Sequence, residues 1–181
     1  LIPAVAMRLW AEERRTGTIE LILTLPVTMT ELVVGKFLAA WIFITLGLCL
    51  TFPLVLTVMY LGSPDAGAIF TAYVGSFLMA GAYLSVGSMT SAMTRNQVIS
   101  FIISVVICFF LVMVGWPPVT QILSGWAPFW LVNGIASFSF MTHFGSLQRG
   151  VLDLRDVLYF GSVIIFMLIA TGVTLQNRRT A

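Results

Sequence analysis

The feature that most restricts the fold of this chain is the spacing of its charges. Four long stretches carry no charged side chain: residues 37–64, 66–94, 96–148 and 157–177. Each can hold a membrane-spanning helix, which needs roughly 20 apolar residues. Only 9% of the residues are charged and 59% are hydrophobic, whereas about 25% are charged in an ordinary soluble domain. The sequence therefore predicts an all-α, polytopic transmembrane helical bundle.

Turn and breaker residues divide the chain into segments. Gly17 and Pro26 interrupt the first part, Thr28 or Thr30 can cap the next helix with Glu31 in its first turn, and Pro53 predicts a kink. The expected boundaries are 1–11 for the end of one span, 12–30 for a loop, 31–61, 68–93 and 98–115 for three further spans, 116–156 for re-entrant or interfacial helices, and 157–175 for a last span. The segment 116–156 is rich in Gly, Ser, Pro and aromatic residues, and its tryptophans are typical of a membrane interface.

The basic residues predict the orientation. If the spans alternate, one side of the membrane carries Arg8, Arg14, Arg15, Lys36, Arg95, Arg178 and Arg179, and the other carries Arg149 and Arg155. The richer side is expected to be cytoplasmic. The chain starts at Leu1 within apolar sequence and without a signal peptide, so an earlier segment with at least one more span is expected to precede it.

The composition also argues against several functions. The central predicted spans, 68–93 and 98–115, contain no charge of the kind that ion-coupled carriers use as coupling sites. The net charge of +2 is too small to suggest nucleic-acid binding. His143 is the single histidine, without a ligand cluster for zinc, and is expected to have a polar interfacial role rather than to bind solute. No phosphate-binding loop is present, so ATP hydrolysis is not expected of this chain.

Small residues predict one helix-packing face. Gly81, Ser85, Ser88 and Ala92 recur at steps of four, three and four, which lets another helix approach closely. Packing is preferred over a pore lining for this face. Phe138, Phe140 and Phe144 are interpreted as interfacial anchors rather than as a gate, and Cys49 and Cys108 as small apolar residues within spans.

The segment Met7-Arg8-Leu9-Trp10-Ala11-Glu12-Glu13-Arg14-Arg15-Thr16-Gly17-Thr18-Ile19-Glu20-Leu21-Ile22-Leu23-Thr24-Leu25-Pro26-Val27, followed by Gly35-Lys36, resembles the cytoplasmic signature of ABC-2 type permeases. Ile22 stands where that family usually has the second Leu of its Glu-Leu-Leu run. The closing part resembles a branch related to gliding-motility and nitrous-oxide-reductase maturation permeases, through Thr142-His143-Phe144, Arg149-Gly150-Val151, Asp153-Leu154-Arg155-Asp156, Tyr159-Phe160 and the terminal Arg178-Arg179.

The resemblance implies a six-helix, type V exporter-like subunit of which this chain lacks the first helix and most of the second. It also implies partners: cytoplasmic ABC ATPase subunits that carry ATP and Mg²⁺, and a second permease half in a homo- or heterodimer. The chain itself would hold no cofactor and would lie in a bacterial-type cytoplasmic (inner) membrane. The loop would contain a coupling helix that docks on the ATPase, with these candidate residues: Glu12, Glu13, Arg14, Arg15, Gly17, Thr18, Ile19, Glu20, Ile22 and Leu23.

Three functions stay open on the sequence alone. The first is an ATP-driven permease, with export favoured over import. The second is a membrane anchor or scaffold that holds a partner without moving solute, and the third is a channel or ATP-independent carrier. The substrate is not predicted.

Overall fold

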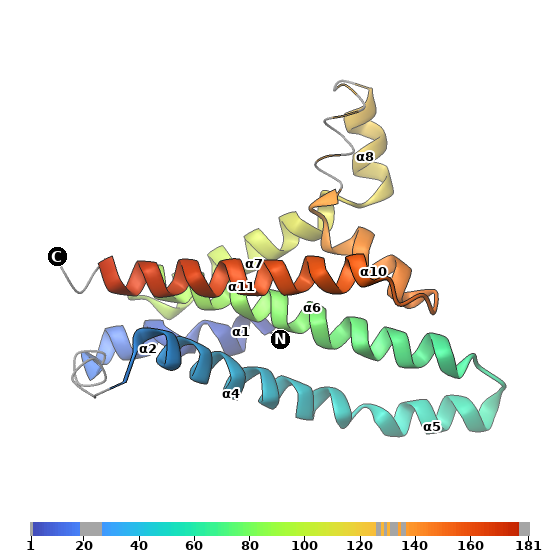
Figure 1. Cartoon of the computed structure of the whole chain (residues 1–181), viewed down its shortest axis with the longest axis horizontal. Coiled ribbons are helices and arrows are strands. Elements are labelled where there is room, and N and C mark those ends of the chain that lie inside the picture. Colours follow the sequence, from blue (N-terminus) through green and yellow to red (C-terminus); the bar gives the residue numbers. More distant parts are fainter. Residues whose placement is uncertain are drawn as a thin grey trace.

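The computed structural model describes residues 2–18, 27–125, 128, 130, 134 and 137–177. This part of the chain is 84% helical and contains no strand. Three of its helical segments are long and apolar enough to cross a membrane: Met29–Leu61, Ala66–Met93 and Leu154–Asn177. The expected all-α membrane bundle is therefore confirmed. Figure 1 shows these long helices running side by side.

The first helical segment is divided where a single helix was expected. Helix α1 (Ile2–Ala6) and helix α2 (Arg8–Thr16) are separated at Met7. Helix α2 ends at Gly17, which has a φ of 76°. A left-handed residue is a common way to end a helix, and glycine adopts that conformation without a steric penalty. The expected break at Gly17 is thus where the structure has it.

The first long span consists of helix α4 (Met29–Cys49) and helix α5 (Phe52–Leu61). Thr28 begins α4 with a capping box: its hydroxyl accepts from the Glu31 N–H at 3.3 Å, and the Glu31 carboxylate accepts from the Thr28 N–H at 2.9 Å. The interruption lies at Leu50 and Thr51. Pro53 sits in the first turn of α5, so the break comes just before the proline and not at it, because its ring disfavours helix in the preceding turn.

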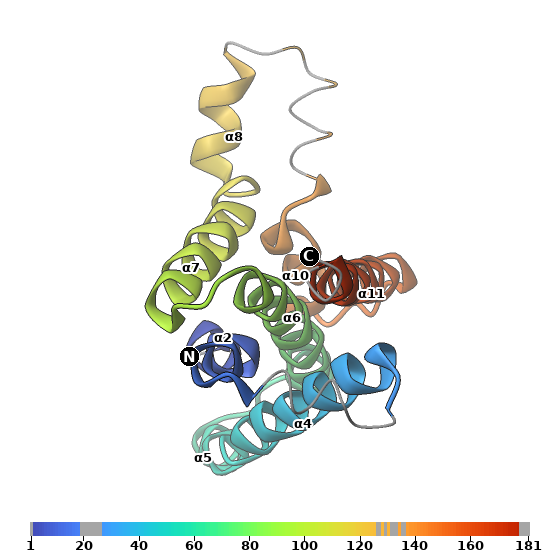
Figure 2. The same ribbon diagram turned by 90° about the vertical axis from the view of Figure 1, so that its left-hand side faces the viewer.

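Helix α6 (Ala66–Met93) runs through the middle of the bundle (Figure 2). It packs against α1, α2 and α4. It also packs against three later helices: α7 (Gln97–Met113), α10 (Phe140–Gln148) and α11 (Leu154–Asn177). Asp65 caps its start by accepting from the Gly67 N–H at 2.8 Å. Its second half, from Ala80, is almost wholly buried. This helix therefore positions the other elements.

Helix α7 is the shortest of the predicted spans. Its 17 residues rise about 26 Å, less than the ~30 Å of a hydrocarbon core. It buries one stripe, Ser100, Ser104 and Cys108, and exposes large apolar residues elsewhere. Helix α8 (Pro117–Ser124) follows and extends away from the bundle, across the direction of the long helices (Figures 1 and 2). A helix that lies across the direction of the membrane-spanning helices runs along the membrane surface, as expected for an interfacial segment.

The last span begins earlier than expected. Helix α11 starts at Leu154 and not near Val157, so Asp156 belongs to its first turn and is buried at 6% exposure.

Phe140 of α10 is fully buried and contacts Tyr83 and Phe160, with ring centroids 5.1 and 5.7 Å apart. The expectation of an interfacial anchor is wrong for Phe140, whereas Phe138 is 69% exposed. The reason is the turn at Ser139, which directs α10 back onto α6.

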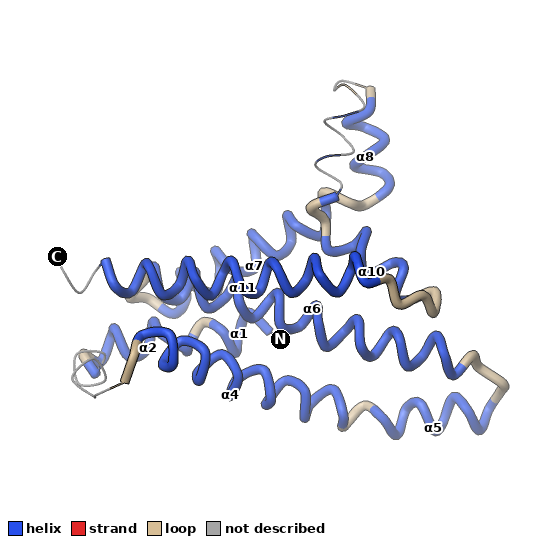
Figure 3. The backbone as a smooth tube through the Cα atoms, viewed as in Figure 1, coloured by secondary structure: helices blue, strands red, loops and turns tan. Residues whose placement is uncertain are grey.

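The segments that carry most basic residues lie at one end of the bundle. The end of α2, the start of α4, the turn between α6 and α7 and the end of α11 share that end, and the turn before α11 lies at the other (Figure 3). This is the arrangement expected from alternating spans.

Candidate functional site

Helix α2, which leads into the candidate coupling segment at residues 12–30, is fastened to α6 by a hydroxyl group. The first backbone N–H groups of a helix have no partner within the helix. In α2, Ser91 of α6 supplies one: its hydroxyl oxygen accepts from the Trp10 N–H at 3.1 Å and from the Ala11 N–H at 3.0 Å. The same hydroxyl donates to the Met7 carbonyl at 2.9 Å. Insertion of a side chain into the hydrogen-bond ladder explains the division between α1 and α2.

Trp10 holds the same face of α2 against α6. Its side chain is 1% exposed, and its indole N–H donates to the Ser88 hydroxyl at 3.1 Å. One turn later, the Arg14 guanidinium donates to the Ala92 carbonyl. Buried aromatic residues with a satisfied N–H contribute both apolar area and geometric definition. Helix α2 is therefore bonded to α6 along its length.

Lys36 of α4 joins α2 from another direction. Its ammonium group pairs with the Glu13 carboxylate, donates to the Leu9 carbonyl at 3.1 Å and lies 4.4 Å from the centroid of the Trp10 ring. A cation over an indole face adds favourable energy. Among the described residues, the second carboxylate oxygen of Glu13 is buried without a hydrogen-bond partner. The charge of Lys36 is thus the main compensation that the described residues supply for this partly buried carboxylate.

The ten candidate coupling residues fall into three groups. Glu13 and Arg14 face the bundle through the contacts above. Four others are exposed: Glu12, Arg15, Gly17 and Thr18. The remaining four, Ile19, Glu20, Ile22 and Leu23, lie outside the described residues.

The four small residues of the expected packing face are all buried in α6. A Cβ on Gly81 would lie 2.9 Å from the Trp41 ring of α4 and 3.0 Å from Ile164 of α11. The Ser85 hydroxyl donates to the Ala82 carbonyl of its own helix at 2.8 Å, and Ser88 and Ala92 meet α2 as described. Contacts to α2, α4 and α11 therefore all converge on this stretch of α6.

A polar cluster that the sequence analysis missed lies at the other end of the bundle. His143 of α10 places its Nδ1 2.6 Å from an Asp156 carboxylate oxygen and its Nε2 2.9 Å from the Ser137 carbonyl oxygen. The Ser146 hydroxyl contacts the second Asp156 oxygen. Both His143 and Asp156 are less than 10% exposed. The expected bounds place Asp156 at the end of the interfacial segment 116–156, whereas the structure includes it in the first turn of α11, where it is buried.

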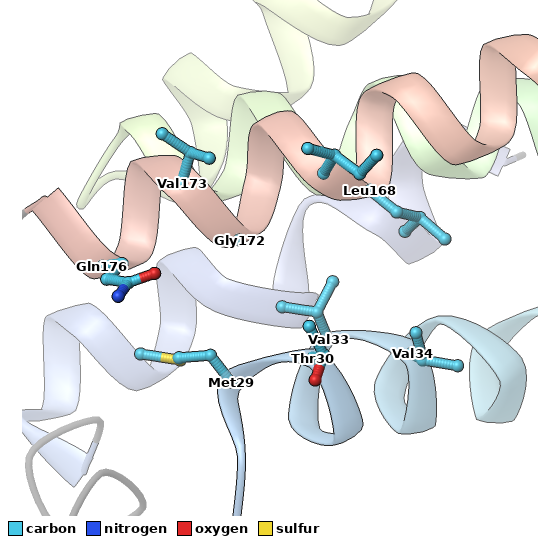
Figure 4. Close-up of a pocket in the computed structure, with 9 residues that line it drawn as sticks. Met29, Thr30, Val33, Val34, Leu168, Gly172, Val173 and Gln176 are labelled. Atoms are coloured by element: carbon cyan, nitrogen blue, oxygen red, sulfur yellow. The ribbon is translucent and has the colours of Figure 1, made fainter.

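An apolar groove separates α4 from α11 near the candidate coupling segment (Figure 4). It is lined by Met29, Thr30, Val33, Val34, Leu168, Ile169, Gly172, Val173 and Gln176. Among the described lining residues, only Thr30 and Gln176 offer a polar side chain to a ligand. Within the described residues, no group of three or more His, Cys, Asp or Glu side chains is placed to hold a metal ion.

Comparison with protein families matches residues 2–176 to a family described as ABC-2 family transporter protein. No curated protein and no solved structure matches the chain. The matched range includes α2, with its contacts to α4 and α6, as well as the last span. The chain therefore belongs to the ABC-2 family of transporter membrane proteins.

Proposed function

We propose that this chain is the permease subunit of an ATP-driven exporter that moves its substrate by alternating access. ATP would be hydrolysed by separate cytoplasmic ATPase subunits, and a second permease half would complete the pathway. Membership of the ABC-2 family supports a permease, and the arrangement of α2 supports energy input from one end of the bundle.

The observation that carries the proposal is the double attachment of α2. Ser91, Ser88 and Ala92 bind it to α6, and Lys36 binds it to α4. Because α6 packs against α11, α10, α7 and α4, a displacement of α2 would be passed to several spans at once. A loop lying loosely on the membrane surface would lack such connections.

The candidate coupling residues in and just after α2 would have two different roles, docking on the ATPase and transmitting its movement. Exposed Glu12, Arg15 and Thr18 are available to dock on the ATPase, and Gly17 provides the bend. Glu13 and Arg14 would transmit movement instead, because they face Lys36 and the Ala92 carbonyl. Docking and transmission are therefore expected to be separable by mutation.

The docking experiment is a pull-down of the full-length protein from gently solubilised membranes, with mass spectrometry of the copurifying proteins. We expect a stoichiometric ATPase with the wild type. Glu12→Lys reverses an exposed charge on α2 and should strongly reduce its recovery. Arg149→Glu reverses an exposed charge at the opposite end and serves as the matched control. Equal ATPase recovery with both variants would contradict docking through α2, and no ATPase at all would favour a scaffold.

The transmission experiment uses Lys36→Met in the same complex. This variant leaves the Glu13 carboxylate without its cation, at a cost of about 1–3 kcal/mol to the local contact. We expect the ATPase to remain bound and to hydrolyse ATP. Hydrogen exchange in α4 and α6 should lose its dependence on nucleotide, whereas the Lys36→Arg variant should retain part of it. An unchanged response to nucleotide in Lys36→Met would refute the role of this contact.

The narrower resemblance to permeases of gliding motility and nitrous-oxide-reductase maturation stays a prediction, since the family match is to ABC-2 proteins as a whole.

A further inference from the structure

The polar cluster around His143 joins three parts of the chain. Asp156 belongs to α11, His143 and Ser146 belong to α10, and Ser137 precedes α10. The imidazole also stacks on the Tyr159 ring, with centroids 3.9 Å apart and planes at 19°. The Tyr159 hydroxyl in turn donates to the Phe138 carbonyl. The side chains of His143 and Asp156 are only 9% and 8% exposed.

Both nitrogens of the His143 ring face oxygen acceptors. A backbone carbonyl can only accept, so Nε2 must carry a proton to bond with Ser137 at 2.9 Å. The 2.6 Å contact between Nδ1 and the Asp156 oxygen also needs a proton between the two atoms. That proton belongs to an imidazolium facing a carboxylate or to a carboxylic acid facing a neutral imidazole. In either form the pair holds it.

Removal of this proton must break one of the two bonds. A neutral imidazole has one N–H and two acceptors to satisfy. If the N–H stays on Nε2, the lone pair of Nδ1 faces the lone pairs of the Asp156 carboxylate. If it moves to Nδ1, the lone pair of Nε2 faces the Ser137 carbonyl. Neither tautomer preserves the arrangement of the three groups.

We propose that His143 and Asp156 form a proton-linked tie that joins Ser137, α10 and α11 and that loses one of its two bonds as the pH on that side of the membrane rises. Both bonds are made while the pair holds its proton. The side concerned is the one that the basic residues place outside the cytoplasm, so the tie would respond to external pH. This inference does not depend on transport activity.

Within the described part of the chain, few other ionisable groups surround the pair. Tyr159 of α11 is in direct contact with the imidazole, and Tyr83 of α6 contacts Phe140 on α10. Helix α7, which also packs against α10, carries no Asp, Glu, Lys, Arg or His in Gln97–Met113, and Cys108 is its ionisable side chain. Asp153, whose carboxylate accepts from the Arg155 N–H, and Arg149 and Arg155 are exposed in the adjacent turn. The pair is therefore the ionisable unit at the core of this contact.

A spectroscopic test reads the proton directly. His143 is the single histidine of this sequence, so selective ¹⁵N labelling of histidine gives a ring signal that can be assigned by its loss in His143→Gln. The test uses the full-length protein in lipid nanodiscs, without a histidine tag. We expect a protonated Nε2 and a proton shared with Asp156 at low pH, and a neutral ring at high pH. A neutral ring without a bond at Nδ1 throughout would overturn the proposal.

A second test uses Asp156→Asn as the critical variant. An Asn amide can donate to Nδ1 of a neutral imidazole while Nε2–H bonds to Ser137, so the tie no longer needs the additional proton. Hydrogen exchange of α10, corrected for the intrinsic effect of pH, should rise roughly tenfold to a hundredfold with pH in the wild type. It should stay flat in Asp156→Asn.

Ser146→Ala is the matched control for that experiment. It removes the hydroxyl next to Asp156 but leaves both ring contacts, so the pH dependence should persist. The same pH dependence in Asp156→Asn as in the wild type would refute the tie, as would its loss in Ser146→Ala.

Discussion

Single glycines determine how closely other helices approach α6. A Cβ on Gly87 would overlap the Cβ of Ala6 and would lie 3.6 Å from the Ser104 hydroxyl oxygen. Ala6 and Ser104 are both fully buried, so neither has room to move. This contact lies just before the point where α1 gives way to α2. The position of α2 therefore depends on the absence of a side chain at residue 87.

We expect Gly87→Ala to lower stability by about 1–3 kcal/mol, because additional atoms in a packed interior force their neighbours apart. The measurement is the apparent melting temperature of the full-length protein in detergent. Gly161→Ala is the control, since a Cβ there meets nothing within 4 Å. It should leave stability unchanged or raise it by up to about 1 kcal/mol through helix propensity. Equal losses in the two variants would argue against close packing at Gly87.

At the scale of elements, α2 depends on α6 for its own first turn. Its cap residue, Met7, forms no side-chain cap hydrogen bond, and Ser91 replaces that cap from a helix about 80 residues away. A local cap would let α2 form independently. A cap supplied by α6 makes the presence and direction of α2 depend on the position of α6.

The variant Ser91→Ala should therefore fray the start of α2 while leaving the rest of the bundle folded. It removes an acceptor for two buried N–H groups, and each unsatisfied group costs about 1–3 kcal/mol. Faster hydrogen exchange confined to residues 8–16 would be the expected signal. Ser162→Ala is the control, because that exposed serine donates to the Tyr159 carbonyl of its own helix and to no other described residue. Unchanged exchange in α2 would show that Ser91 is dispensable.

At the scale of the whole molecule, the two ends of the bundle differ in charge and in construction. One end has α2 with its network to α4 and α6, and the other has α10 and the turn before α11 with the His143 cluster. Figure 1 shows the turn between α6 and α7 at the first end and the turn before α11 at the second. The two ends should therefore face different compartments.

Cysteine labelling in intact cells tests this orientation. In a background with Cys49→Ala and Cys108→Ala, a membrane-impermeant maleimide should label Val151→Cys without permeabilisation. Arg95→Cys should be labelled only after permeabilisation, because its turn lies on the side rich in basic residues. Both positions are exposed, so access is decided by the membrane. The opposite labelling pattern would invert the topology.

Local signals predicted much of the fold. The Thr28 and Glu31 pattern, the break at Gly17 and the charge-free stretches each depend on neighbours in the chain, and the corresponding helices begin or end within a few residues of the predicted bounds. The kink predicted at Pro53 lies earlier in the structure, at Leu50 and Thr51, because a proline disturbs the turn before it. For the candidate coupling segment, the sequence proposes candidate residues but does not show which way each one faces.

The sequence by itself determined that this chain is a membrane-embedded helical bundle, because bilayer insertion responds to apolar length and to the placement of charge. Only the tertiary structure decided that Ser91 caps α2, that Lys36 compensates Glu13, and that Asp156 lies buried against His143. Those partners are 13 or more residues apart, and their pairing depends on how helices rotate and approach one another. That rotation is decided by close packing around α6, which no single segment of the chain encodes.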